Sequence, residues 1–138
     1  ELKSVPSGFA SLEYEIFDYQ PVDAIKLDIV VHFEKIDALS QIVIRAKAEQ
    51  IGRKIVKKLK EVIPRQNFEI AVQATVGGKV VAREDISGYR KDVTAGMYGG
   101  DITRRQKLLK KQVKGKKRMR AFGKVNLPQE AFLAVLER

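Results

Sequence analysis

The chain has 138 residues, of which 44% are hydrophobic, so it can form one domain with its own core. It contains no cysteine and a single histidine, which excludes disulfides and zinc sites built from thiolates or several histidines. Its apolar runs are far shorter than the roughly 20 residues that span a bilayer. The chain starts at Glu1, and nothing near it resembles a signal peptide, so we expect a piece of a longer protein.

The net charge of +10 is distributed unevenly. Residues 1–64 carry ten basic and ten acidic side chains, whereas residues 65–138 carry seventeen basic and seven acidic ones. This asymmetry indicates a polyanionic partner, which is RNA, DNA or an anionic membrane.

Residues 9–21 alternate between apolar and polar side chains, as is typical of a half-buried strand. Gly8 is typical of the end of a preceding helix. Pro21 has no amide hydrogen and suits a linker better than a sheet interior. We therefore predict a domain boundary here, with residues 1–20 in a preceding domain and residues 21–138 in a second one.

Four further strands are predicted, in two hairpins. Apolar residues alternate over 24–33, and after a turn at 34–37 another apolar run over 38–44 is the predicted partner strand. Residues 67–85 predict the second hairpin, in which Gly77–Gly78 form the tight turn.

Between the hairpins, residues 47–64 change to a helical period with one apolar stripe, and Pro64 ends the helix. The other face of this helix is basic, which is most often a solvated surface but is also a secondary candidate for RNA contact. The resulting order of strand, strand, helix, strand and strand predicts an α+β fold, with an antiparallel sheet packed on one main helix.

Residues 86–101 have no regular period, and we interpret them as a flexible elbow. Their glycines fit neither a phosphate loop nor a dinucleotide fingerprint. The segment Thr103–Lys124 then contains eleven Lys or Arg and no Asp or Glu, and either Asp101 or Thr103 is a suitable helix cap. Like charges four residues apart disfavour an isolated helix, so we expect this basic helical extension, about 96–124, to depend on nucleic acid for its order.

The chain ends with a predicted short helix that has Pro128 at its first position. Its apolar face consists of Ala131, Phe132, Val135 and Leu136. Packing on the core of the same domain and docking on a partner both remain open.

No catalytic constellation is present in the sequence. A cysteine nucleophile is missing, and the serines lie far along the chain from the single histidine, His32. The alternation places His32 on the polar side of its strand, which predicts a surface histidine. We therefore predict no catalytic residues, no metal site and no cofactor within this chain.

Four segments resemble the C-terminal domain of the LepA family of translation GTPases, which are back-translocating elongation factors. They are "IPRQNFEIAVQA", "YGGDITRRQKLLKKQ", "GKKRMR" and "LPQEAFLAVL". By this resemblance, residues 1–20 are the end of the ferredoxin-like domain V shared with elongation factor G, and the rest is the domain peculiar to LepA.

The resemblance also implies partners. LepA proteins bind the ribosome, and their C-terminal domain reaches along the tRNA acceptor arm toward ribosomal RNA near the peptidyl transferase centre. GTP and magnesium belong to an N-terminal G domain that has no counterpart in this chain. The family further implies a monomer in the cytoplasm, with the inner membrane surface or an organelle as alternative locations.

The combined prediction is a ribosome- and tRNA-binding module, and the alternative is a basic module for anionic membrane surfaces. RNA is favoured because the basic segment lacks the continuous apolar face of a membrane-surface helix. The primary candidate RNA-binding residues are Tyr98, Arg104, Arg105, Lys107, Lys110, Lys111, Lys114, Lys116, Lys117, Arg118, Arg120 and Lys124. The secondary candidates are Arg53, Lys54, Lys57 and Lys58.

Overall fold

The computed structural model describes residues 13–97, 99 and 101–136. The strands are β1 (Ala24–Val31), β2 (Glu34–Lys35), β3 (Gln41–Ile44), β4 (Ile70–Val76) and β5 (Lys79–Ile86). The helices are α1 (Ala48–Val62), α2 (Ile102–Phe122) and α3 (Gln129–Leu136), and short 3-10 turns lie at Asp37–Leu39 and Arg45–Lys47. The predicted α+β class is confirmed.

All strand pairs in the sheet are antiparallel, and β1 lies at its centre. One edge of β1 pairs with β4, which in turn pairs with β5. Its other edge is shared, because β3 pairs with the first half of β1 and β2 with its end. The β4–β5 connection is the predicted glycine turn, in which Gly77 and Gly78 have φ angles of 56° and 83°.

The core lies between this sheet and α1. Alternate residues of β1 and β4, such as Leu27, Ile29 and Val72, are fully buried against α1 residues such as Val56 and Leu59. Gly52 allows this close approach, because a Cβ there would lie 3.0 Å from the Cβ of Ala74.

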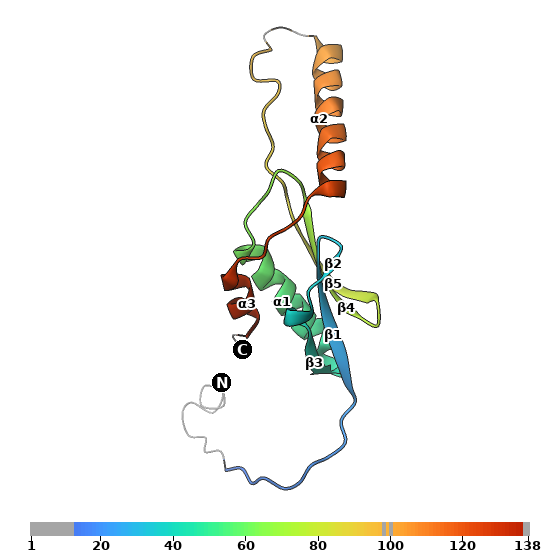
Figure 1. Cartoon of the computed structure of the whole chain (residues 1–138), viewed down its shortest axis with the longest axis vertical. Coiled ribbons are helices and arrows are strands. Elements are labelled where there is room, and N and C mark those ends of the chain that lie inside the picture. Colours follow the sequence, from blue (N-terminus) through green and yellow to red (C-terminus); the bar gives the residue numbers. More distant parts are fainter. Residues whose placement is uncertain (1–12, 98, 100, 137–138) are drawn as a thin grey trace, which may run out of the picture.

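Helix α3 packs against α1, so its apolar face is used within the domain (Figure 1). Ala131 and Val135 are buried as predicted, and Phe132 packs at the edge of the core. Leu136 differs from the prediction, since 72% of it is exposed. Leu136 lies about 100° from Val135 and about 140° from Ala131 around the helix, so it is outside the face that those two buried residues form.

The predicted strand over residues 9–21 is wrong in its described part. Residues 13–21 have no regular structure, and Tyr14, Ile16 and Phe17 are each at least 85% exposed. A strand needs a hydrogen-bonding neighbour, and none of the described strands pairs with this segment, which leads away from the sheet (Figure 1). Gly8 and residues 9–12 lie outside the described residues, and the assignment of 1–20 to a preceding domain stays a prediction.

The strand predicted over 38–44 also differs in its bounds. Asp37–Leu39 form a 3-10 turn, and β3 begins only at Gln41. Asp28 on β1 holds this corner together, because Ser40 donates a hydrogen bond to its carboxylate at 3.0 Å and Lys35 lies 3.1 Å away. Burial alone raises the pKa of Asp28, but these two partners and Lys26 outweigh it and hold the pKa below its usual value.

Residues 87–97, 99 and 101–123 project from one end of the body as an arm (Figure 1). The arm consists of α2 and the irregular segment that leads to it. No side chain of α2 is fully buried, so the helix stands outside the core.

Candidate nucleic-acid interface

Helix α2 starts at a local cap. The side chain of Asp101 accepts a hydrogen bond of 3.0 Å from the Arg104 amide, and its charge suits the helix N-terminus. Of the two predicted caps, Asp101 is therefore the one used. The helix ends at Gly123, whose amide bonds to the Met119 carbonyl at 2.7 Å.

One side of α2 is uniformly basic. Arg104, Lys107, Lys111, Lys114 and Arg118 follow one another at spacings of three and four residues, so they share one helix face. Lys110 and Lys117 lie beside this row, and all seven are exposed. We call these seven residues the basic face. It extends about 21 Å along the helix at 1.5 Å per residue.

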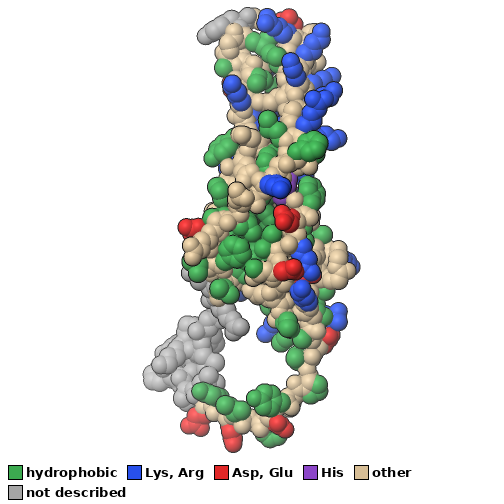
Figure 2. Space-filling view, in the orientation of Figure 1, with side chains coloured by type: hydrophobic (Ala, Val, Ile, Leu, Met, Phe, Trp, Pro, Cys, Tyr) green, Lys and Arg blue, Asp and Glu red, His purple; other side chains and the backbone are tan. Residues whose placement is uncertain are grey.

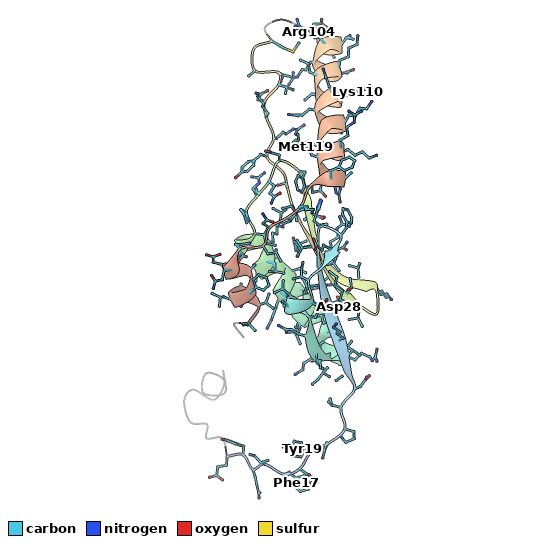
Figure 3. The ribbon with its side chains drawn as sticks, in the orientation of Figure 1. Phe17, Tyr19, Asp28, Arg104, Lys110 and Met119 are labelled. Atoms are coloured by element: carbon cyan, nitrogen blue, oxygen red, sulfur yellow. The ribbon has the colours of Figure 1, made fainter. Side chains whose placement is uncertain are left out.

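Figure 2 shows Lys and Arg side chains gathered along the outer side of the arm, and Figure 3 shows Lys110 pointing away from the molecule. Among the described residues, no carboxylate lies within 4 Å of any cation of the basic face. Unpaired cations in a row leave a strong positive potential, which attracts a polyanion.

The remaining candidates on and near α2 are in other environments. Arg105 and Lys124 are exposed, whereas Lys116 and Arg120 are half-buried. Lys116 donates to the Tyr89 carbonyl, and Arg120 lies 3.5 Å from Glu69. Tyr98 lies outside the described residues.

The opposite side of α2 faces the segment that leads into it. Gln112 donates to the Lys91 carbonyl at 2.5 Å, and Lys116 binds the Tyr89 carbonyl as described above. These side chains fasten the irregular segment along the helix. Further along it, the carboxylate of Asp92 accepts bonds from Thr94, which lower the pKa of Asp92.

The prediction that His32 is a surface residue is wrong. His32 is only 8% exposed, and its Nε2 lies 2.8 Å from the Arg120 carbonyl at the end of α2. Since a carbonyl only accepts, Nε2 is the donor. The His32 ring also packs on Phe68, with a centroid distance of 4.8 Å, so His32 joins the arm to the body.

Two close contacts complete this joint. A Cβ at Gly123 would lie 2.4 Å from the ring of Phe68, and a Cβ at Gly88 would lie 2.7 Å from the Phe68 backbone. Both ends of the arm therefore cross Phe68 where only glycine fits.

The secondary candidates lie on α1, in the body. Arg53 pairs with Glu49 at 2.6 Å, and Lys58 donates to the Ala134 carbonyl at 3.2 Å. Lys54 and Lys57 are exposed. The structure does not bring these residues together with the basic face, which lies on the arm (Figure 1).

No helix in the described part of the chain is both long enough and apolar enough to cross a membrane. Similarly, residues 13–97, 99 and 101–136 contain no group of three or more side chains suited to hold a metal ion.

Comparison with protein families matches residues 31–137 to the family described as GTP-binding protein LepA C-terminus. The chain belongs to this family. The match includes the whole arm, so the arm is part of the LepA C-terminal unit. The resemblance recognised from the four sequence segments is thereby confirmed.

Three curated relatives are named elongation factor 4. The chain is 62% identical over 136 residues to that of Mycoplasma mobile and 57% over 137 residues to that of Mycoplasmopsis synoviae. It is 59% identical over 136 residues to that of Mesomycoplasma hyopneumoniae. Each alignment covers 99% of this chain but only 23% of the relative.

The family description names GTP binding. The sequence of this chain contains no G-x-x-x-x-G-K-[ST] phosphate loop, and its Gly77–Gly78 pair forms a hairpin turn.

Proposed function

We propose that this chain is the ribosome- and tRNA-binding C-terminal module of a translation GTPase, and that the arm is its RNA-binding element. The observation that carries the proposal is the basic face, seven exposed cations without a carboxylate partner among the described residues. Such a row neutralises phosphates along an RNA backbone and releases their counterions.

Membership of the LepA family supports the specific partners in this proposal, which are the ribosome and tRNA. The relatives are elongation factors by name, and the partners implied by the LepA resemblance are the tRNA acceptor arm and ribosomal RNA near the peptidyl transferase centre. In the whole protein, GTP hydrolysis takes place in a separate G domain, with this chain positioning the factor on cytoplasmic ribosomes that are elongating. In this proposal, residues 1–20 form the end of the ferredoxin-like domain V.

An anionic membrane surface is the competing partner for the basic face. A helix that lies on a membrane exposes one continuous apolar side. In α2, the exposed apolar residues are Ile102, Val113, Met119 and Phe122, and they do not share one face. Ile102 and Val113 lie about 20° apart around the helix, whereas Met119 and Phe122 lie about 100° to 180° away from both of them. This arrangement favours RNA.

The test is a comparison of two variants that lose the same charge. Lys110, Lys114 and Lys117 of the basic face are changed to Gln in one, and Arg53, Lys54 and Lys57 of α1 in the other. Binding to tRNA and to ribosomes is measured across a salt series. By the duplex rule, losing three phosphate contacts lowers the slope of log affinity against log salt by about 2 to 3.

We expect this lower slope for the α2 variant and an unchanged slope for the α1 variant. The opposite result would move the RNA contact to α1, the secondary candidate. Vesicles with anionic lipids serve as the second ligand. Flotation of the chain with them, without binding of tRNA or ribosomes, would replace the proposal with the membrane alternative.

A further inference from the structure

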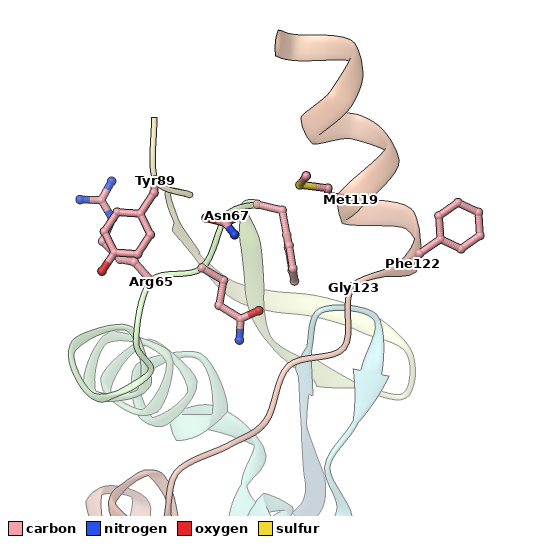
Figure 4. A pocket seen from close by; sticks show the side chains of 8 residues that line it. Arg65, Asn67, Tyr89, Met119, Phe122 and Gly123 are labelled. Carbon is pink, nitrogen blue, oxygen red and sulfur yellow. The ribbon is translucent and has the colours of Figure 1, made fainter. Parts of the chain in front are cut away.

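A groove lies at the base of the arm, on the inner side of α2. It consists of two hollows of 590 and 380 Å³ that share Asn67, Tyr89 and Met119. Both volumes fall in the range of about 300–1,000 Å³ that is usual for small-molecule pockets. In Figure 4, Tyr89 and Arg65 stand on one side of the first hollow, and Met119 points toward them from α2.

Tyr89 and Arg65 form one wall of the groove, which we call the aromatic wall, and both residues are held in position by hydrogen bonds. The Tyr89 amide bonds to the Gln66 carbonyl at 2.7 Å, and its own carbonyl accepts from Lys116. The Arg65 guanidinium lies 5.3 Å from the centre of the Tyr89 ring. Arg65 is held in turn by bonds to Ser87, of 2.8 Å to its carbonyl and 3.2 Å to its hydroxyl.

This wall is ordered but still accessible. Tyr89 remains 58% exposed, so one part of its ring is free for another planar group. Because its backbone and its arginine neighbour are already held, little conformational entropy is lost when a ligand stacks on it.

The other side chains around the groove are complementary to a nucleotide. Asn67 is exposed, and its amide makes no hydrogen bond to the described part of the chain, so it offers both a donor and an acceptor. Met119, Leu108 and Val93 add apolar surface. The charged residues that line the two hollows are all cations, namely Arg65, Lys91, Lys111 and Lys116.

We propose that this groove binds an unpaired nucleotide of RNA. The base stacks on Tyr89 and bonds to Asn67 through its edge, and Lys91 and Lys111 contact its phosphates. Lys111 also belongs to the basic face, so one RNA can reach the groove and the face together. The inference rests on the proposed function and adds a preference for single-stranded RNA next to a duplex.

The test uses an RNA hairpin with a single-stranded adenosine tail and the same hairpin with a blunt end. Stacking of one base on an aromatic side chain corresponds to about a fivefold to 150-fold gain in affinity. We therefore expect the chain to bind the tailed hairpin more tightly by a factor in this range. Changing Tyr89 to Ala should remove that preference but leave the affinity for the blunt hairpin and the salt slope unchanged.

Two controls keep the result specific to the ring. Tyr89→Phe retains the stacking surface and should retain the preference for the tail. The bonds that hold residue 89 and Arg65 all end on the backbone or on Ser87, so Tyr89→Ala should fold normally, which thermal unfolding checks.

Equal affinity of the unaltered chain for both hairpins would overturn the groove proposal while leaving the basic face intact. So would a preference for the tail that survives Tyr89→Ala. If neither hairpin binds, the proposed function fails together with the groove.

Discussion

His32 and Phe33 turn the chain from β1 into β2 with φ angles of 49° and 70°. Turns of this kind favour Asn and Gly, since other residues in this conformation are strained by roughly 1–2 kcal/mol each. Both side chains contact the end of the arm. His32 binds the Arg120 carbonyl, and the Arg120 guanidinium lies 5.6 Å from the centre of the Phe33 ring. The contacts to the arm offset the strain in the turn.

Changing Phe33 to Gly separates the backbone strain in the turn from the side-chain contact with the arm. The ring is 70% exposed, so the core loses little. Relief of strain, about 1–2 kcal/mol, should slightly exceed the cost of roughly 0.5–1 kcal/mol for the flexibility of Gly in the unfolded chain. We expect the body to unfold at the same or a higher temperature, while amides near Arg120 exchange faster with solvent.

His32→Ala is the matched comparison, because it loses the bond to Arg120 and the contact with Phe68 but keeps the strained turn. It should lower the stability of the body as well as loosen the arm. A Phe33→Gly variant less stable than His32→Ala would contradict this account of the turn.

The role of His32 could not be predicted from the sequence. The apolar alternation was followed through residue 33, as if the strand continued, and this placed His32 on the polar side. The strand ends at Val31, and the turn after it redirects the side chain toward Phe68. Only the fold brings residues 32, 68 and 120 together.

Gly115 within α2 and Gly123 directly after it are in contrasting surroundings. A Cβ at Gly115 would meet no atom within 4 Å, whereas a Cβ at Gly123 would lie 2.4 Å from the Phe68 ring. Gly115 therefore only weakens the helix, but Gly123 allows the end of the helix to reach the body.

The two Gly→Ala substitutions should act in opposite directions. Gly115→Ala should stabilise α2 by about 1 kcal/mol, because alanine favours the helix. Gly123→Ala forces Phe68 to move and should destabilise the joint by roughly 1–3 kcal/mol, as overpacking does. Circular dichroism during thermal unfolding measures both. Equal effects of the two substitutions would show that Phe68 moves aside freely.

At the level of whole elements, the sequence is most informative where a local rule decides the structure. The glycine pair at 77–78 forms its turn where predicted, and the cap of α2 is Asp101, one of the two residues predicted for it. Prediction fails where the partner of an element matters. The alternation in residues 13–21 has no strand to pair with among the described residues. The 3-10 turn Asp37–Leu39 shortens the strand predicted over 38–44, which begins only at Gln41 as β3.

The molecule as a whole combines a body that has a core with an arm that has none. Buried residues are found in β1, β4, β5, α1 and α3, but not in α2. The excess of positive charge in residues 65–138 predicts a polyanionic partner, but nothing in the sequence predicts the groove. Arg65, Asn67, Tyr89 and Met119 come from three separate segments, and no spacing in the sequence links them.

This division predicts two regions of different stability. Few buried contacts hold the arm, so it should open far more often than the body. Limited trypsin digestion of the free chain should cut first between Arg104 and Lys124 and leave a resistant body from Ala24 to Arg83. Saturating tRNA should slow the early cuts. Equal protection of both regions in the free chain would contradict the prediction.

The joint around Phe68 has a mechanical consequence. Helix α2 has 21 residues and is therefore about 31 Å long, yet its described contacts with the body are confined to its last turns. With its pivot at one end, the arm acts as a lever. Each degree of tilt at Phe68 moves the far tip by roughly half an ångström, so a shift too small to disturb the core becomes a displacement of several ångströms at the tip.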